Sequence, residues 1–201
     1  CLDYLVTKEK VKAIIGIAMS TEFLAIVSAM EAAKIPVIAC IAQSNSLFAK
    51  NMKYWVTTSC PGDVITNWIS EAVPELIKET SIKHDRIACV YGDITQMLDQ
   101  HKTWKENIKG TEIEKNLVLD HKYSSKPTDA ELSSVVLKVK AANPDIAILI
   151  NHRSVVPKWW KVAHEVGYQA PVTFDAGTNT LFTKAGWDLV GDAIMKEMVD
   201  S

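Results

Sequence analysis

Short apolar runs bounded by turn residues alternate along this chain with longer amphipathic segments, and this rhythm limits the possible folds more than any other feature. The runs are continuously apolar, as in 146–150 (Ile-Ala-Ile-Leu-Ile), which is typical of strands buried on both faces. The segments between them carry apolar residues at helical spacing. Because strands joined by crossover helices pair in parallel, the sequence predicts an α/β fold with parallel sheets.

The predicted elements follow this alternation from end to end. Strands are expected at 11–16, 36–41, 54–58, 87–91, 113–119, 145–150, 171–174 and 194–199. Helices are expected at 22–34, 63–80, 96–109, 129–142, 157–167 and 181–185. A hydroxyl residue before Glu22, either Ser20 or Thr21, is expected to cap the first of these helices, and Gly110 is expected to close the third.

Composition excludes several classes of protein. The 201 residues are 48% hydrophobic and 23% charged with a formal charge of −2, which is typical of a globular domain and not of a disordered chain. No basic stripe indicates nucleic-acid binding, and no apolar run approaches the roughly 20 residues of a membrane span. No signal peptide opens the chain, which leaves two alternatives: a cytoplasmic protein, or a chain that begins after a removed segment.

The cysteines and histidines show no metal-ligand spacing. Neither CxxC nor HExxH occurs, so no metal site is predicted, and no glycine-rich phosphate loop indicates a bound cofactor. Cys89 lies in an apolar run and is expected to be a small buried residue. A disulfide between Cys40 and Cys60 is geometrically possible, and the sequence does not decide whether it forms. The three histidines expected at the surface are His84, His101 and His121.

Ligands of parallel α/β sheets bind beyond the carboxyl ends of the strands, which selects the loops 18–21, 41–46, 92–97, 151–155 and 175–179. Ser20 and Thr21 lie between a strand and a helix N-terminus, where amide groups and the helix dipole attract an anion; the alternative is that Ser20 only caps the helix. His152 and Asp175 follow two further strands, and Asp175 could equally form an Asx-type turn or cap a helix.

A hydrolytic triad of Ser20, His152 and Asp175 is the enzymatic alternative. The sequence lacks the GxSxG elbow and offers no oxyanion hole, so nothing orders the three residues around a nucleophile. A protein that binds a small polar solute and catalyses nothing is therefore the favoured interpretation.

Several segments in order resemble the type I periplasmic binding proteins of the leucine/isoleucine/valine-binding class. These are 5–16 (Leu-Val-Thr-Lys-Glu-Lys-Val-Lys-Ala-Ile-Ile-Gly), 31–38 (Glu-Ala-Ala-Lys-Ile-Pro-Val-Ile), 86–93 (Arg-Ile-Ala-Cys-Val-Tyr-Gly-Asp), 141–147 (Ala-Ala-Asn-Pro-Asp-Ile-Ala) and 163–168 (Ala-His-Glu-Val-Gly-Tyr). The resemblance implies two Rossmann-like lobes that close on a solute. It further implies an extracytoplasmic protein, lipid-anchored or not, that delivers the solute to an ABC permease; a ligand-sensing regulatory domain is the alternative.

The resemblance also implies a division of the chain. Residues 1–57 correspond to part of the N-lobe and residues 58–201 to the C-lobe, with a hinge crossing near 54–59. The family's N-lobe begins with a strand, a helix and another strand that have no counterpart here, so the chain is expected to be a fragment with an incomplete N-lobe and exposed apolar sheet edges.

In the N-lobe, the resemblance implies that Ser20, with the neighbouring backbone at Thr21, holds the carboxylate of a ligand such as an amino acid. Ala42 and Gln43 match an Ala-Thr pair that binds the α-amino acid group. Since glutamine replaces a small hydroxyl residue at this position, a larger or different polar group of the ligand is expected to be recognised here.

In the C-lobe, the resemblance places Met97 in the region of a family tyrosine. His152 and Arg153 fall where the family often has an aromatic residue after a strand. Asp175 falls close to the acid that pairs with the ligand ammonium. No cofactor and no metal are expected.

Overall fold

The computed structural model describes residues 2–17, 19–40, 42–80, 82–168, 172–175 and 184–192. The chain divides into two compact units, residues 1–65 and 66–201, which are described separately. Helix α4 (Gly62–Thr80) begins in the first and continues in the second. The predicted assignment of 1–57 and 58–201 to an N-lobe and a C-lobe stays a prediction.

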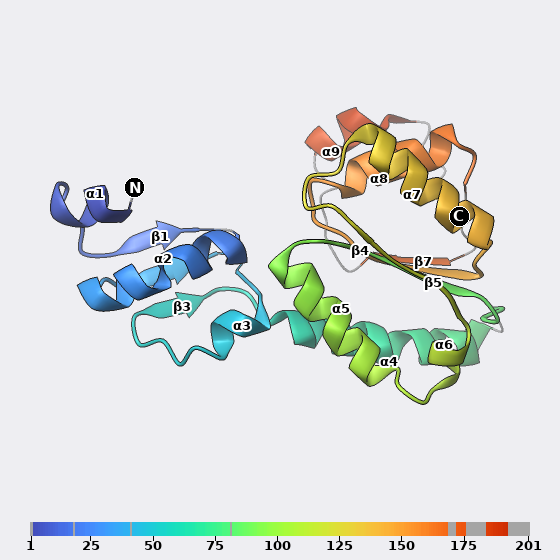
Figure 1. Cartoon of the computed structure of the whole chain (residues 1–201), viewed down its shortest axis with the longest axis horizontal. Coiled ribbons are helices and arrows are strands. Elements are labelled where there is room, and N and C mark those ends of the chain that lie inside the picture. Colours follow the sequence, from blue (N-terminus) through green and yellow to red (C-terminus); the bar gives the residue numbers. More distant parts are fainter. Residues whose placement is uncertain are drawn as a thin grey trace. The chain divides into compact units, whose positions relative to one another are not determined.

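Unit 1 is built on sheet A, in which three parallel strands stand in the order β1-β2-β3 (Figure 1). The strands are β1 (Ile14–Gly16), β2 (Val37–Ala39) and β3 (Trp55–Thr57). The helices are α1 (Leu2–Thr7), α2 (Ser20–Ala33) and α3 (Asn45–Phe48). Helix α2 buries Phe23, Val27 and Met30 against the sheet, and this core holds the strand ends in place.

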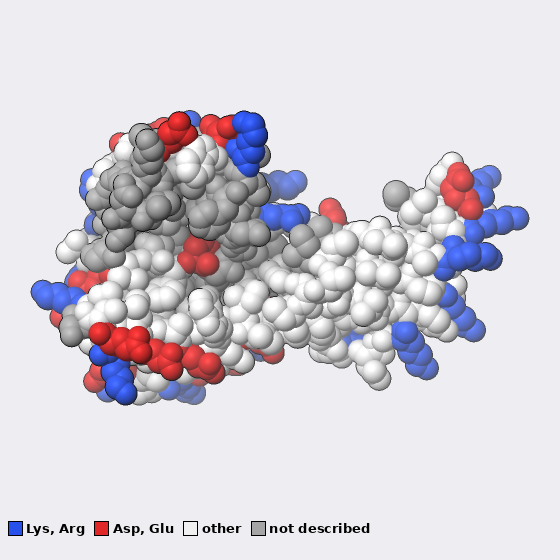
Figure 2. Space-filling model, turned by 180° about the vertical axis from the view of Figure 1, so that it is seen from behind, with Lys and Arg blue, Asp and Glu red and all other residues white. Residues whose placement is uncertain are grey.

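The other face of sheet A exposes a row of aliphatic side chains. Ile15, Ile38 and Val56 are register partners across the three strands, so they lie side by side on the face opposite to the α2 core. Ile15 is 75% exposed and Val56 is 57% exposed. Figure 2 shows a broad uncharged surface on this unit, with lysines gathered at one end. Exposed apolar sheet edges were expected. In the described residues of sheet A, the exposed apolar surface is one face of the sheet.

Unit 2 is a three-layer α/β/α sandwich around sheet B, whose parallel strands stand in the order β5-β4-β6-β7 (Figure 1). The strands are β4 (Ile87–Gly92), β5 (Leu117–Tyr123), β6 (Ile146–Ile150) and β7 (Val172–Asp175). On one face lie α4, α5 (Thr95–Asn107) and α6 (Glu112–Lys115). On the other lie α7 (Asp129–Ala142), α8 (Val156–Glu165) and α9 (Lys184–Val190).

The centre of unit 2 is β6, in which all five residues are buried. Both faces of this strand are covered, which explains why its sequence is continuously apolar. Trp159 of α8 and Val136 of α7 pack in the core on one face of the sheet. None of the described helices is long and apolar enough to cross a membrane.

The predicted α/β class with parallel sheets is confirmed by both sheets, and α7 has the predicted bounds. Both ends of α7 have typical capping residues. The Thr128 hydroxyl accepts a hydrogen bond from the Glu131 amide at the N-terminus, and Asn143 adopts a left-handed conformation at φ +44° at the C-terminus. The expected burial of Cys89 is also observed.

Three predictions of local structure were wrong. The strand predicted at 113–119 is the one-turn helix α6 followed by β5, because Ile113 is buried from a helical turn and the strand continues to Tyr123. Helix α5 ends at Asn107, with Ile108 as its C-cap, and Gly110 lies in the following turn at φ +77°. The third error concerns Ser20, which is the first residue of α2 and not its cap; the cap position is Met19.

The remaining predictions fall partly outside the described residues. The strand predicted at 194–199 lies outside the described residues. Of the helix predicted at 181–185, residues 181–183 also lie outside them, and helix α9 is described from Lys184 to Val190. The sequence did not decide whether Cys40 and Cys60 form a disulfide. In the structure both are exposed free thiols.

Phe23→Ala is expected to destabilise unit 1 by about 3–5 kcal/mol, because the ring is fully buried and packs against Trp55 at a centroid distance of 5.3 Å. Phe48→Ala is the matched control, since Phe48 also packs on Trp55, at 5.2 Å, but is 36% exposed. Hydrogen–deuterium exchange of residues 1–65 measures the effect. Equal loss of protection in both variants would contradict the assignment of the core.

Candidate functional site

The Ser20 hydroxyl joins the start of α2 to the loop that follows β2. Its Oγ accepts hydrogen bonds from the backbone amides of Gln43 and Ser44, both at 3.1 Å, and the residue is only 3% exposed. The predicted site loops 18–21 and 41–46 therefore meet at the carboxyl edge of sheet A. The link is made by the side chain of Ser20 and not by a helix cap.

This link positions a helix N-terminus at the edge of the sheet. The first intrahelical bond of α2 runs from the Phe23 amide to the Met19 carbonyl, so the amides of the first turn, at Ser20, Thr21 and Glu22, precede the helical ladder. Together with the partial positive charge of a 14-residue helix, these amides suit a carboxylate.

The backbone directly before this helix is strained. Ile17 adopts φ +60°, a left-handed conformation that β-branched residues rarely take. Such strain costs roughly 1–3 kcal/mol and tends to occur where a loop is held for binding. Ile17 lies between β1 and α2, the helix whose first residue, Ser20, is bonded to the β2 loop.

The β2 loop is held from several directions. Ala42 is fully buried, and its carbonyl accepts from the Thr57 hydroxyl at 3.4 Å. The Gln43 side-chain amide donates to the Ser59 hydroxyl at 2.5 Å, and the backbone carbonyl of Gln43 accepts from the Gly62 amide at 2.7 Å. The loop is therefore preorganised, and the long Gln43 side chain is committed in part to Ser59.

In unit 2, a tyrosine crosses the carboxyl edge of sheet B. Tyr123, at the end of β5, donates its hydroxyl to Asn151 Oδ1 at 2.8 Å, although β4 stands between β5 and β6. The crossing requires Gly92, because a Cβ at this position would lie 3.2 Å from the Tyr123 hydroxyl oxygen and 3.3 Å from two ring carbons. Gly92 thus provides space for the ring.

Electrostatics keep Tyr123 protonated and donating. Burial raises the pKa of its hydroxyl well above the ordinary value, and the negative charge of Asp175 raises it further, against a smaller opposite effect of the His152 backbone. Asn151 is fully buried and accepts this bond with its oxygen, so its Nδ2 group faces away from the tyrosine. Among the described residues that Nδ2 group has no hydrogen-bond partner, which leaves a buried donor at the edge of the sheet.

His152 and Arg153 add further donors beside Asn151. His152 Nδ1 accepts from the Ser154 amide at 3.3 Å and lies 2.8 Å from the Ser154 hydroxyl, which leaves Nε2 as the protonated nitrogen. Burial and the charge of Arg153 lower the pKa of His152, so the ring is neutral near pH 7. Arg153 is partly buried, and it makes no hydrogen bond or ion pair with any residue that the structure describes.

Asp175 and Met97 complete the set of predicted residues. Asp175 is the last residue of β7 and pairs in register with Leu149, so it belongs to the strand and not to a turn after it. Met97, in the first turn of α5, is 3% exposed and packs in the interior. The carboxyl edge of sheet B therefore offers several donors and one acid, which suits a polar solute.

The geometry gives no support to a hydrolytic triad. The Ser20 oxygen accepts from two backbone amides in unit 1, and His152 Nδ1 is bonded to Ser154 and not to Asp175. Neither a base that activates the serine nor an acid that orients the histidine is present among these contacts.

Sequence reasoning selected the loop beginning at Asn151 but did not single out Asn151 or Tyr123. Tyr123 was missed because the predicted strand ended at residue 119, before the edge of the sheet. The exposure of β5 alternates up to the buried tyrosine, but residues 120–122 (Asp-His-Lys) are all polar, so no apolar alternation in the sequence extends the strand to Tyr123.

The sequence profile described as periplasmic binding protein matches residues 1–191. The chain belongs to the periplasmic binding protein family. A search of curated proteins found no match. Structures similar to this periplasmic binding protein include an ABC-transporter solute-binding protein from R. palustris in complex with 4-hydroxybenzoate (19% identity, TM-score 0.73). A branched-chain amino acid transporter substrate-binding protein from Streptococcus pneumoniae, in complex with isoleucine, is also similar (20% identity, TM-score 0.73).

These similarities establish the fold. The chain is covered to 95% by the first structure and to 93% by the second, but it spans only 49% of the length of each. The predicted membership of the type I periplasmic binding proteins is thereby confirmed, and these relatives are binding proteins of transport systems by their descriptions.

Gly92→Ala is expected to destabilise the periplasmic binding protein by roughly 1–3 kcal/mol, because the new methyl group presses on the Tyr123 ring. In a Tyr123→Val background the same change is expected to cost almost nothing. Urea unfolding of the two single variants and the double variant measures the coupling. Additive losses would show that the tyrosine does not cross over Gly92.

Lowering the pH is expected to destabilise the protein through His152. The folded state lowers the pKa of this ring, so the unfolded chain, with a pKa of about 6.5, takes up the proton first. The free energy of unfolding should fall as the pH drops through 6.5 to the folded-state pKa, and the contribution should stay constant below it. His152→Gln should lack this contribution, and equal pH dependence of urea midpoints in both proteins would refute it.

Proposed function

We propose that this protein is the solute-binding component of an ABC importer and captures an amino acid or a related small carboxylate. The observation that carries the proposal is the double hydrogen bond to Ser20, which fixes the β2 loop against the N-terminus of α2. Family membership supports the class of function, since the solved relatives bind small carboxylates, isoleucine in one and 4-hydroxybenzoate in another.

Unit 1 is proposed to bind the carboxylate. The amides at Ser20, Thr21 and Glu22, with the helix dipole behind them, match the charge and size of a carboxylate group. Each charge-assisted hydrogen bond contributes roughly 1.5–3 kcal/mol, so a few of them are enough for micromolar affinity. Ala42 and Gln43 are proposed to contact the same end of the solute from the adjacent loop.

Unit 2 is proposed to bind the remaining polar groups. His152 Nε2, Arg153 and the buried Asn151 amide donate hydrogen bonds, while Asp175 accepts from an ammonium or hydroxyl group. Met97 is proposed to bound the apolar part of the solute. This set accommodates an amino acid through its ammonium and a hydroxybenzoate through its hydroxyl group.

The proposed partners follow from this role. An ABC permease in the membrane receives the solute, and the protein works outside the cytoplasm, in the periplasm or at the cell surface. Capture and release require no bond chemistry, so no catalytic residue and no cofactor are assigned. Residues 1–57 and 58–201 are proposed to form the parts of the two lobes, with the hinge near 54–59.

Calorimetric titration of the protein against the standard amino acids and a series of hydroxybenzoates tests the proposal. Saturable binding of at least one carboxylate is expected, with loss of affinity for the corresponding amide, which has the same shape but no charge. Binding that is equally strong for the acid and its amide would contradict the carboxylate site. Silence across both series would contradict the proposed function itself.

Ser20→Ala is expected to lower the affinity for the ligand roughly tenfold to a hundredfold, because the loop amides lose their common acceptor. Ser28→Ala is the matched control, since Ser28 lies exposed on the same helix. Calorimetry gives the affinity, and urea unfolding shows whether unit 1 remains folded. An unchanged affinity in a folded Ser20→Ala protein would overturn the role of Ser20.

A further inference from the structure

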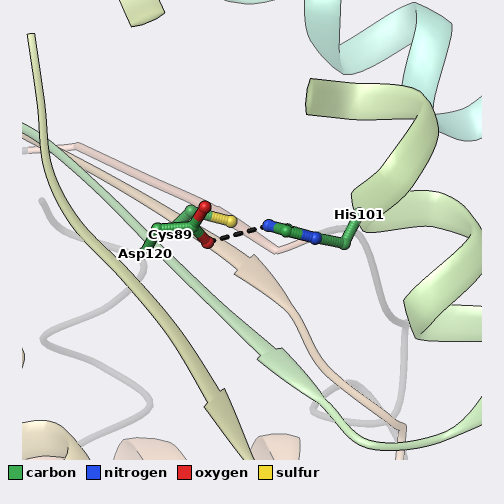
Figure 3. Close-up of side chains that lie close together, drawn as sticks. All are labelled: Cys89, His101 and Asp120. Atoms are coloured by element: carbon green, nitrogen blue, oxygen red, sulfur yellow. Dashed lines mark hydrogen bonds and ion pairs between the residues drawn. The ribbon is translucent and has the colours of Figure 1, made fainter. Parts of the chain in front are cut away.

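Three potential metal ligands from separate elements converge on the α5 face of sheet B. Cys89 Sγ on β4, His101 Nε2 on α5 and a carboxylate oxygen of Asp120 on β5 all lie within 4.8 Å of one another (Figure 3). Cys89 and Asp120 are register partners on adjacent strands, so their side chains emerge on the same face. Among the described residues this is the one group of its kind.

The histidine is held in place for such a role. Its Nε2 lies 2.8 Å from Asp120 Oδ1, and its ring stacks on Tyr91 with a centroid distance of 3.6 Å and an interplanar angle of 9°. The expectation that His101 is a simple surface residue is therefore wrong, since its side chain is only 14% exposed. The packing of α5 against sheet B brings the His101 ring close to β4 and β5, and the spacing of the three residues in the sequence does not indicate this contact.

From this geometry we infer that Cys89, His101 and Asp120 bind one zinc-class divalent ion, with a fourth position open to water. Sulfur, imidazole nitrogen and carboxylate oxygen together favour Zn²⁺ among the common divalent ions. Zn–N and Zn–O bonds of about 2.0–2.1 Å place tetrahedral ligand atoms about 3.3 Å apart. The His101–Asp120 contact therefore lengthens slightly when the ion replaces the proton between them, while the buried thiol releases its own proton.

Two neighbouring features act against the ion and determine how tightly it binds. Cys89 is fully buried, and burial, together with the charge of Asp120, raises the pKa of its thiol. Lys105 Nζ lies 3.3 Å from Asp120 Oδ2, the oxygen turned away from His101. Lys105 is 34% exposed, so it can move toward solvent when a cation enters. The inference is independent of the proposed transport function.

The test uses the full chain with Cys1→Ala, Cys40→Ala and Cys60→Ala, so that Cys89 is the sole thiol. Co²⁺, a spectroscopic substitute for Zn²⁺, is expected to bind one equivalent and to give a thiolate-to-cobalt charge-transfer band that Zn²⁺ abolishes. Zn²⁺ at a hundredfold excess over its Kd is expected to raise the Tm by about 5–10 °C. Absence of the band in this sole-thiol protein would overturn the site.

Variants of the other ligands separate the site from adventitious binding. His101→Gln and Asp120→Asn alter partly exposed residues, and each is expected to weaken Co²⁺ binding more than tenfold without loss of the far-UV CD spectrum. Lys105→Gln is expected to tighten binding roughly threefold to tenfold by removing a competing charge. Unchanged affinity in His101→Gln and Asp120→Asn, or weaker binding in Lys105→Gln, would overturn the inference.

Discussion

A single buried hydroxyl group organises the edge of unit 1 on which the proposed function depends. Among the described residues sheet A has three short strands, so the loops at its carboxyl edge need a further constraint to hold one conformation. Ser20 supplies it by accepting two backbone amides from the β2 loop, at little cost in side-chain entropy because serine has one rotatable bond. The helix N-terminus and the loop are thereby held together as one element, which is the proposed site for the carboxylate.

Unit 2 reaches a similar result through different chemistry. Here the constraint is a tyrosine that crosses a neighbouring strand over Gly92 and fixes the orientation of the Asn151 amide. Fixing the amide oxygen on Tyr123 directs the nitrogen elsewhere, and no described residue accepts from it, so an acceptor on the proposed ligand would offset the cost of burying this donor. An unmatched buried donor of this kind favours ligands with an acceptor at one position and disfavours those without it.

Much of the fold could be predicted from the sequence because its signals are local. The strand 146–150 is recognised by its continuous apolar run, and the helix 129–142 by the helical spacing of its apolar residues and by its capping residues. Ser20 and His152 were selected by their place after a strand, and their roles as ligand-binding residues stay predictions. The crossing of Tyr123 to Asn151 and the approach of His101 to Cys89 join distant residues through packing, and neither leaves a pattern of spacing in the sequence.

The central claim is that the N-terminus of α2, held by Ser20, binds the carboxylate of the solute. Backbone amide chemical shifts, followed by NMR during titration with isoleucine, 4-hydroxybenzoate and the other acids of the panel, address it most directly. The amides of residues 20–22 should shift along one saturation curve with those of Gln43 and Ser44. Saturable shifts confined to other residues, or no saturable shift with any of these acids, would contradict the account.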